Sequence, residues 1–136
     1  MTDPPPANRE IKVLFVDDEV EFAQVVSKRL RRLGFQVSTA NNGSEALRLA
    51  RGNEFDVAVL DLKMAGMDGL EILRTLLILL PQIKVVMLTG HGSSQIAQQC
   101  LDEGAFSYLN KPCEFSKLVE NINSASSGGL KARGAS

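Results

Sequence analysis

Five short apolar runs alternate with five helix-like patterns along the chain, and this alternation limits the fold more than any other feature. The apolar runs predict buried strands at residues 11–16, 35–40, 56–60, 84–88 and 106–109. The helical patterns cover residues 20–33, 42–51, 68–80, 93 or 94 to 103, and 114–123. Strands that are apolar almost throughout are typical of a parallel sheet with helices on both faces. Because crossover connections are right-handed, the sequence predicts a doubly wound α/β sheet.

Capping residues mark where several of these helices begin. Asn42 followed by Glu45, and Asp68 followed by Glu71, form two capping boxes. Gly34 is placed to end the first helix. Within that helix, apolar residues at helical spacing predict one buried stripe, made of Phe22, Val25, Val26, Leu30 and Leu33.

The alternating pattern is confined to residues 10–123, which we expect to form one domain. Residues 1–9 are rich in proline and polar groups and predict a disordered lead. Residues 124–136 are rich in glycine, serine and alanine, which predicts a flexible tail or the start of a linker.

Composition excludes several classes of protein. The formal net charge of -1 gives no general attraction to nucleic acid or to an anionic membrane. The longest apolar run, residues 76–80, is far too short to span a bilayer. Two cysteines, Cys100 and Cys113, are too few for a disulfide framework. We therefore expect a soluble cytoplasmic protein that contacts neither nucleic acid nor membrane directly.

The run at residues 76–80 carries more apolar surface than one helix face needs. Such a helix is either buried or part of an interface. Burial beneath the tail is the favoured interpretation. Contact with a partner, with a second copy in a homodimer, or with an output domain is the alternative.

Polar and charged residues follow the predicted strands. Asp17, Asp18 and Glu19 follow the first strand, Asp61 the third, Thr89 the fourth, and Lys111 with Pro112 the fifth. Taken singly, each has a structural explanation, and capping of the first helix is the favoured one for Asp17 or Asp18. Ligands of doubly wound sheets nevertheless bind at the carboxyl ends of the strands. The whole set therefore predicts one functional site at that edge.

Several carboxylates at one edge need a cation among them. Two carboxylates about 4 Å apart repel by roughly 4 kcal/mol at an effective dielectric constant near 20. Oxygen ligands suit Mg²⁺, and no histidine or cysteine cluster has zinc spacing. An aspartate beside such an ion is a competent nucleophile toward phosphorus. Lys111 offers a positive charge and Thr89 a hydroxyl to the phosphoryl oxygens.

Four segments of the chain resemble the receiver domains of two-component response regulators. They are VLFVDDE at 13–19, VLDLKMAGMDG at 59–69, MLTGH at 87–91 and YLNKP at 108–112. Their order and spacing match the family, and the resemblance covers residues 11–123. It implies a flavodoxin-like sheet with strand order 2-1-3-4-5 and five helices.

The resemblance also assigns roles to individual residues. Asp61 is the implied phosphoacceptor, and a sensor histidine kinase or phosphotransfer protein is the implied donor. Mg²⁺ is bound directly by Asp18, Asp61 and the Lys63 carbonyl, and largely through water by Asp17. Lys111 pairs with the phosphoryl group, and the Lys111–Pro112 bond is usually cis in this family. Thr89 and Tyr108 form a switch that alters the surface made by the fourth helix, fifth strand and fifth helix.

The chain departs from the family at Ala65, where a proline is usual, so we expect a less rigid loop beside the metal site. Lys63 and His91 occupy positions where the family varies the lifetime of the phosphorylated state. Solvated side chains there are an equally good interpretation.

These expectations describe a switch rather than an enzyme, since the protein phosphorylates and slowly dephosphorylates itself but turns over no substrate. An aspartyl-phosphate phosphatase of the haloacid-dehalogenase type would need a carboxylate at position 63, where a lysine stands. A flavodoxin-like FMN protein would need a hydroxyl- and glycine-rich phosphate loop after the first strand, where three acidic residues stand that would repel the phosphate of FMN. The output is either a separate protein or a downstream domain of a longer chain.

Overall fold

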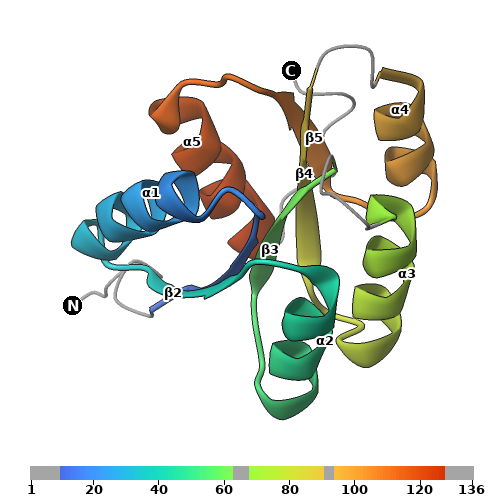
Figure 1. The fold of residues 1–136 in the computed structure, drawn as a ribbon, viewed down its shortest axis with the longest axis horizontal. Coiled ribbons are helices and arrows are strands. Elements are labelled where there is room, and N and C mark those ends of the chain that lie inside the picture. The colour runs from blue at the N-terminus through green and yellow to red at the C-terminus, as the bar shows by residue number, and fades with distance from the viewer. Residues whose placement is uncertain (1–9, 63–67, 91–93, 128–136) are drawn as a thin grey trace.

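The computed structural model describes residues 10–62, 68–90 and 94–127, and in them a parallel sheet forms the centre of the molecule (Figure 1). Its strands are β1 Lys12–Val16, β2 Gln36–Ala40, β3 Val57–Asp61, β4 Lys84–Thr89 and β5 Ser107–Asn110. They lie in the order β2-β1-β3-β4-β5, and every neighbouring pair is parallel. The predicted sheet type and strand order are confirmed.

A helix follows each strand and packs on one of the two faces of the sheet. The helices are α1 Val20–Arg32, α2 Gly43–Gly52, α3 Gly69–Leu79, α4 Ser94–Asp102 and α5 Phe115–Ser126. In Figure 1, α1 and α5 cover one face, while α2, α3 and α4 cover the other. The chain is therefore doubly wound, as the right-handed crossover rule requires.

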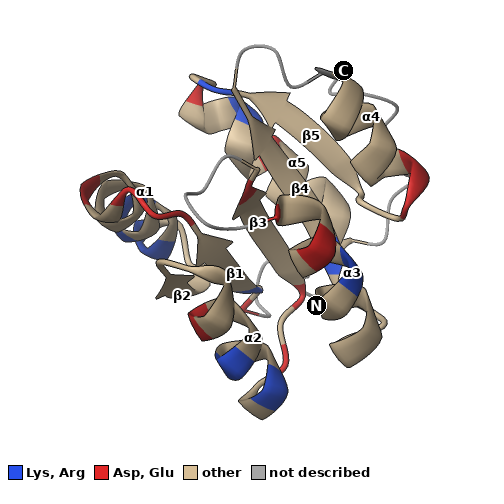
Figure 2. Cartoon of the chain, turned by 45° about the vertical axis from the view of Figure 1, so that its right-hand side comes forward, with Lys and Arg blue, Asp and Glu red and all other residues tan. Residues whose placement is uncertain are grey.

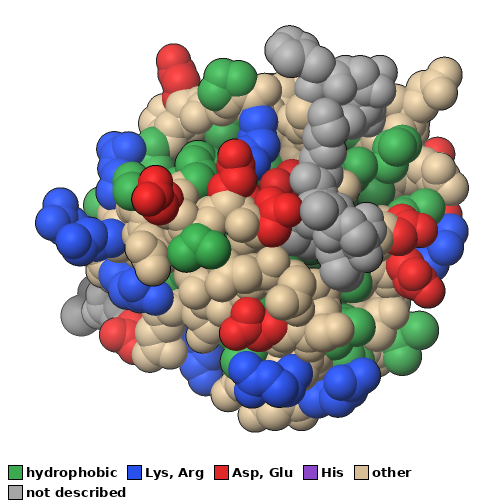
Figure 3. All heavy atoms as spheres, in the orientation of Figure 1, with side chains coloured by type: hydrophobic (Ala, Val, Ile, Leu, Met, Phe, Trp, Pro, Cys, Tyr) green, Lys and Arg blue, Asp and Glu red, His purple; other side chains and the backbone are tan. Residues whose placement is uncertain are grey.

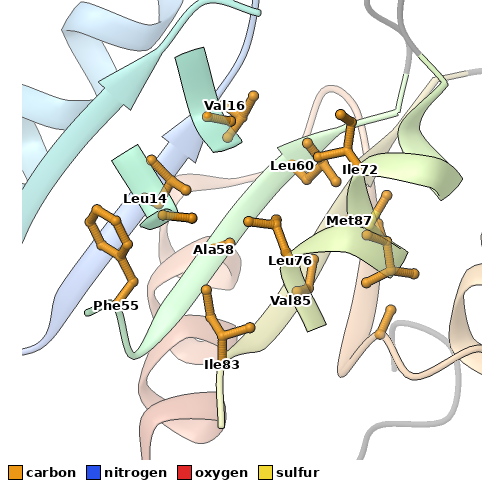
Figure 4. Packing of buried hydrophobic residues seen from close by; sticks show 14 of the residues in the cluster. Leu14, Val16, Phe55, Ala58, Leu60, Ile72, Leu76, Ile83, Val85 and Met87 are labelled. Atoms are coloured by element: carbon orange, nitrogen blue, oxygen red, sulfur yellow. The ribbon is translucent and has the colours of Figure 1, made fainter. Parts of the chain in front are cut away.

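Alternate residues of each strand fill two separate cores. Leu14, Ala58 and Val85 lie in register across the sheet and point toward α2, α3 and α4 (Figure 4). Their strand neighbours, such as Val13 and Phe15, point toward α1 and α5. Because both faces are covered, β1 and β3 bury nearly every side chain, and this explains their continuous apolar sequence.

The capping residues found in the sequence begin two of the helices. Asn42 Oδ1 accepts a hydrogen bond of 2.8 Å from the backbone N–H of Glu45, and Asp68 Oδ1 accepts one of 3.0 Å from Leu70. The first helix is different, because its N-cap is Glu19, which makes no side-chain capping bond. The expectation that Asp17 or Asp18 caps this helix is wrong. Asp17 instead accepts from the N–H of Glu19, ahead of the helix.

The buried stripe of α1 matches the prediction at Val26 and Leu30 and differs from it elsewhere. The helix buries Ala23, Val26, Ser27 and Leu30, whereas Phe22, Val25 and Leu33 are exposed by 39%, 59% and 58%. Both sets follow helical spacing, so periodicity alone does not choose between them. The small side chains of Ala23 and Ser27 let the helix approach the sheet closely.

The run at residues 76–80 is divided between the core and the surface. Leu76 is fully buried, and Leu77, Leu79 and Leu80 pack partly against the core shared with α2 and α4. Ile78 points outward and is 76% exposed. The proposed cover is the tail predicted at residues 124–136. Residues 124–126 are not part of a flexible tail but the end of α5, with Ala125 buried, and residues 128–136 lie outside the described residues. Within the described ranges, no helix is long and apolar enough to cross a bilayer.

Two positions of α3 offer a matched test of this packing. We expect Leu76→Ala to lower the free energy of unfolding by about 2–5 kcal/mol, because it leaves a cavity in the core. Ile78→Ala removes a similar side chain from the surface and should change it by less than about 0.5 kcal/mol. Urea unfolding followed by circular dichroism measures both. Equal losses would mean that Ile78 is covered in solution.

Candidate functional site

The carboxyl ends of four neighbouring strands meet at one edge of the sheet, and charged side chains collect there. Asp61 is the last residue of β3 and Thr89 the last of β4, while Asp17 follows β1 and Lys111 follows β5. The acidic stretch between β1 and α1 is red in Figure 2. In Figure 3, several acidic side chains lie close together near the upper centre of the face shown.

Three carboxylates converge at this edge from two parts of the chain. Asp17, Asp18 and Asp61 each place an oxygen within 4.8 Å of the other two. Asp17 and Asp61 are buried, with exposures of 0% and 3%, and Asp18 is exposed at the mouth of the cluster. A set of carboxylate oxygens open to solvent on one side fits a hard divalent cation such as Mg²⁺.

Asp17 is the most constrained member of this cluster. Its backbone N–H donates to the Ala40 carbonyl at 3.0 Å, and its Oδ1 accepts from the N–H of Glu19 at 2.9 Å. Burial raises the pKa of the Asp17 carboxyl, and the charge of Asp61 adds to the rise. The hydrogen bonds from Glu19 and Lys111 offset the rise in pKa only in part. Ionised Asp17 is therefore held in the cluster at a cost in stability.

Lys111 is the cation that balances part of this negative charge. Its Nζ lies 3.1 Å from Asp17 Oδ2, 3.3 Å from Asp61 Oδ2 and 3.3 Å from Glu19 Oε1. Burial lowers the pKa of Lys111, but the charges of Asp61 and Asp17 outweigh burial and leave that pKa raised. The ammonium is thus charged at neutral pH. The bond between Lys111 and Pro112 is cis.

The start of α3 packs closely behind Asp61. A Cβ added to Gly69 would lie 3.3 Å from the Leu62 Cα and 3.4 Å from its carbonyl oxygen. The Leu62 N–H also donates to the Leu88 carbonyl at 2.8 Å. Glycine at position 69 therefore allows the first residue of α3 to pack closely on the backbone of Leu62, which follows Asp61.

Thr89 stands beside the cluster but is bonded away from it. The residue is 1% exposed, and its Oγ1 donates to Asn110 Oδ1 at 2.9 Å. A second acceptor, the Leu109 carbonyl, lies farther away at 3.4 Å. Tyr108 is half-buried and packs against the core that α2, α3 and α4 share. The sequence analysis missed Asn110, because only the register of β4 with β5 reveals its contact.

Two parts of the expected site fall outside the described residues. Residues 63–67 include Lys63, a predicted metal ligand, and Ala65, the departure from the family pattern. Residues 91–93 include His91. The roles expected for these three side chains stay predictions.

A groove between α1 and α5 opens beside the cluster. It has a volume of about 570 Å³, and Phe22, Val25 and Phe115 supply much of its apolar wall. The Arg29 guanidinium lies 4.0 Å from the centre of the Phe115 ring. Lys111 also lines the groove, with its Nζ 4.8 Å from the centre of the Phe22 ring. The exposed apolar residues of α1 therefore border the charged site.

Comparison with known proteins gives a consistent result. The model of the response regulator receiver domain matches residues 13–123, which is most of the chain. The transcriptional regulatory protein ZraR of Klebsiella oxytoca is 35% identical over 119 residues. That match covers 88% of this chain but 27% of ZraR, so the chain spans about a quarter of the length of this relative.

Solved structures with the same fold include other receiver domains. A response regulator receiver domain protein from Clostridium thermocellum is 37% identical, with a TM-score of 0.82 over 87% of this chain and 95% of that one. A response regulator from Burkholderia pseudomallei, solved with a phosphorylated aspartic acid, calcium ion and citrate, is 32% identical. Its TM-score is 0.79, over 88% of this chain and 71% of that one. This chain therefore belongs to the response regulator receiver domain family of two-component signalling.

Proposed function

We propose that Asp61 accepts a phosphoryl group from a sensor histidine kinase or a phosphotransfer protein. The observation that carries the proposal is the position of its carboxylate, within 4.8 Å of two other carboxylates and 3.3 Å from the Lys111 ammonium. This arrangement joins a nucleophile to the groups that neutralise a phosphoryl charge. The phosphorylated aspartic acid of the Burkholderia pseudomallei relative supports the same chemistry here.

The donor set of the cluster fits Mg²⁺, which we propose as the cofactor. Asp18, Asp61 and the Lys63 carbonyl would hold the ion directly, with Asp17 acting largely through water. When bound, Mg²⁺ supplies positive charge that offsets the charge on the phosphoryl oxygens. The calcium ion in the related structure is a hard cation of the same kind.

The chemistry at Asp61 is a displacement at phosphorus. A carboxylate oxygen of Asp61 forms the new P–O bond as the P–N bond of a phosphohistidine breaks and the imidazole leaves. Lys111 then pairs its ammonium with a phosphoryl oxygen and keeps its proton, because its pKa is raised. Water later cleaves the acyl phosphate, so the protein regenerates itself without turning over a substrate.

The new charge is proposed to be read by a switch at β4 and β5. Thr89 turns its hydroxyl toward the phosphoryl group, Tyr108 moves into the space released, and the surface of α4, β5 and α5 changes. An output protein, or an output domain of a longer chain, reads that surface in the cytoplasm. The curated relatives are transcriptional regulators several times longer than the matched segment, which favours an output domain. For assembly, we propose a homodimer contact through the exposed Ile78.

The cost in stability of the carboxylate cluster can be measured with a variant at Asp17. Without a divalent ion, Asp17→Asn should raise the free energy of unfolding by about 1–2 kcal/mol, because it removes a buried charge and leaves Lys111 paired with Asp61 and Glu19. Urea unfolding in EDTA measures this. Mg²⁺ should then stabilise the wild type far more than the variant. A less stable variant in EDTA would contradict the unfavourable burial of Asp17.

The same substitution has a defined pH dependence. The folded-state pKa of Asp17 lies above its ordinary value of 3.8, so the folded state binds this proton more tightly than the unfolded state does. The wild type therefore loses stability from Asp17 as the pH rises above about 3.8. The gain in the free energy of unfolding from Asp17→Asn should be small below that pH and should grow above it. Asp102→Asn, on the exposed part of α4, is the matched control.

A small phosphodonor tests the phosphoacceptor itself. Incubation with acetyl phosphate and Mg²⁺ should add one phosphoryl group to the wild type, measured by intact mass. Asp61→Asn should abolish the gain, because an amide oxygen is a poor nucleophile, while Asp102→Asn should keep it. A phosphorylated Asp61→Asn protein, or a wild type that gains nothing, would remove the proposal.

Variants at Tyr108 test the aromatic part of the switch. Beryllofluoride, a mimic of the phosphoryl group, should alter the hydrogen exchange of residues 94–110 in the wild type. Tyr108→Ala should keep beryllofluoride binding but lose most of this change, because no ring is left to fill the vacated space. Tyr108→Phe, which keeps the ring, should behave like the wild type. An undiminished change in Tyr108→Ala would exclude a role for the ring.

A further inference from the structure

A side-chain hydrogen bond joins Thr89 and Asn110, the last residues of β4 and β5. Thr89 and Asn110 are partners in the register of these parallel strands, so their side chains lie on the same face of the sheet. The Thr89 hydroxyl donates to Asn110 Oδ1 at 2.9 Å, a distance typical of a good hydrogen bond. The backbone fixes the pair from behind, since the Lys111 N–H donates to the Thr89 carbonyl at 2.6 Å.

This hydrogen bond points away from the acidic cluster. Strand β4 lies between β3 and β5 in the sheet. Asp61 ends β3 on one flank of Thr89, whereas Asn110 ends β5 on the other flank. A threonine hydroxyl has one proton to donate, so it can donate a hydrogen bond to an acceptor on only one side at a time. A phosphoryl group on Asp61 and the amide oxygen of Asn110 must therefore compete for it.

We propose that Asn110 is a positioning residue that holds the Thr89 hydroxyl in its unphosphorylated direction and so sets the threshold for switching. The inference rests on the proposed function of Asp61 and adds a residue to it. Thr89 can bond to the phosphoryl group only after it gives up Asn110. The free energy of this hydrogen bond therefore reduces the free energy by which phosphorylation favours the switched state.

The alternative acceptor does not replace Asn110. The Leu109 carbonyl lies 3.4 Å from the Thr89 hydroxyl, at the long limit for a hydrogen bond. Loss of the Asn110 amide would thus leave the hydroxyl weakly held and free to turn. Asn110 is itself exposed, so its replacement removes no part of the buried core. Its role can be separated from a general effect on stability for this reason.

The position of Asn110 also connects the two halves of the switch. Residues 108 and 110 point to the same face of β5, because side chains alternate along a strand. Tyr108 pairs in register with Met87, and Asn110 pairs with Thr89. The bond between Thr89 and Asn110 therefore ties the strand that carries the aromatic ring to the strand that carries the hydroxyl. Release of that bond frees the Thr89 hydroxyl, while the backbone hydrogen bonds between the two strands stay in place.

The test compares beryllofluoride titrations in the presence of Mg²⁺. The chain has 1 tyrosine and 0 tryptophan residues, so its intrinsic fluorescence reports on Tyr108. We expect Asn110→Ala and Asn110→Leu to bind beryllofluoride about twofold to tenfold more tightly than the wild type, the range that one ordinary hydrogen bond supplies. Asn53→Ala, an exposed asparagine that follows α2, is the matched control and should bind like the wild type.

Two further measurements separate positioning from a structural effect. In a Thr89→Val background, which lacks the hydroxyl, Asn110→Ala should not change the affinity for beryllofluoride. In the unliganded Asn110→Ala protein, the Thr89 amide resonance should move toward its beryllofluoride-bound position. Unchanged or weaker binding by both Asn110 variants, or an equal gain in the Thr89→Val background, would overturn the inference. A wild type that binds no beryllofluoride would instead remove the proposed function.

Discussion

The ion-pair network of Lys111 is the interaction on which the rest of the site depends. One ammonium lies within 3.3 Å of three carboxylates, and two of those carboxylates are almost wholly buried. Among the described residues, one positive charge faces these carboxylates, and burial, with the charge of Asp61 added, keeps the pKa of Asp17 raised. The cluster therefore favours any added positive charge. The proposed binding of a divalent ion follows from this imbalance.

The fold is what makes such an imbalance tolerable. Both faces of the sheet are filled by apolar side chains, so polar groups cannot enter the core without losing their hydration. At the carboxyl ends of the strands, the chain changes from buried to solvent-exposed within one or two residues. Val16 is fully buried, Asp17 is buried but ion-paired, and Asp18 is exposed. Three successive residues thus lie in the core, in the charged site and at the solvent-exposed surface.

Much of this arrangement follows from the sequence, and the exceptions share a physical reason. Continuous apolar strands predicted the parallel sheet, and the positions of Asp17, Asp61 and Lys111 after strands predicted their convergence. The predictions for α1 were wrong where small residues mattered. Ala23 and Ser27 are buried because they fit close to the sheet, which a ranking by hydrophobicity does not detect.

Asn110 shows a second limit of sequence analysis. An asparagine before Lys111 has no local pattern that marks it as functional. Its significance arises from the register of β5 against β4, which places it opposite Thr89 after a crossover of 17 intervening residues, from 90 to 106. Contacts of this kind depend on strand pairing across the sheet, and pairing register is not encoded in the spacing along one strand.

The site and the switch together illustrate a conflict between stability and function. A neutral residue at position 17 would relieve charge repulsion, and a more stable apo protein would result, but the cluster would lose a ligand for the ion. The hydrogen bond between Thr89 and Asn110 has the opposite effect in the proposed mechanism, since it stabilises the unphosphorylated state that phosphorylation of Asp61 must overcome. In the proposed mechanism, the carboxylate cluster makes the unmodified site receptive to a cation, and the Thr89–Asn110 bond keeps the surface unchanged until Asp61 is phosphorylated. A phosphorylation switch needs both features. A site without repulsion between carboxylates would bind a cation poorly. A threonine hydroxyl without a partner in the unphosphorylated state would change its direction before phosphorylation.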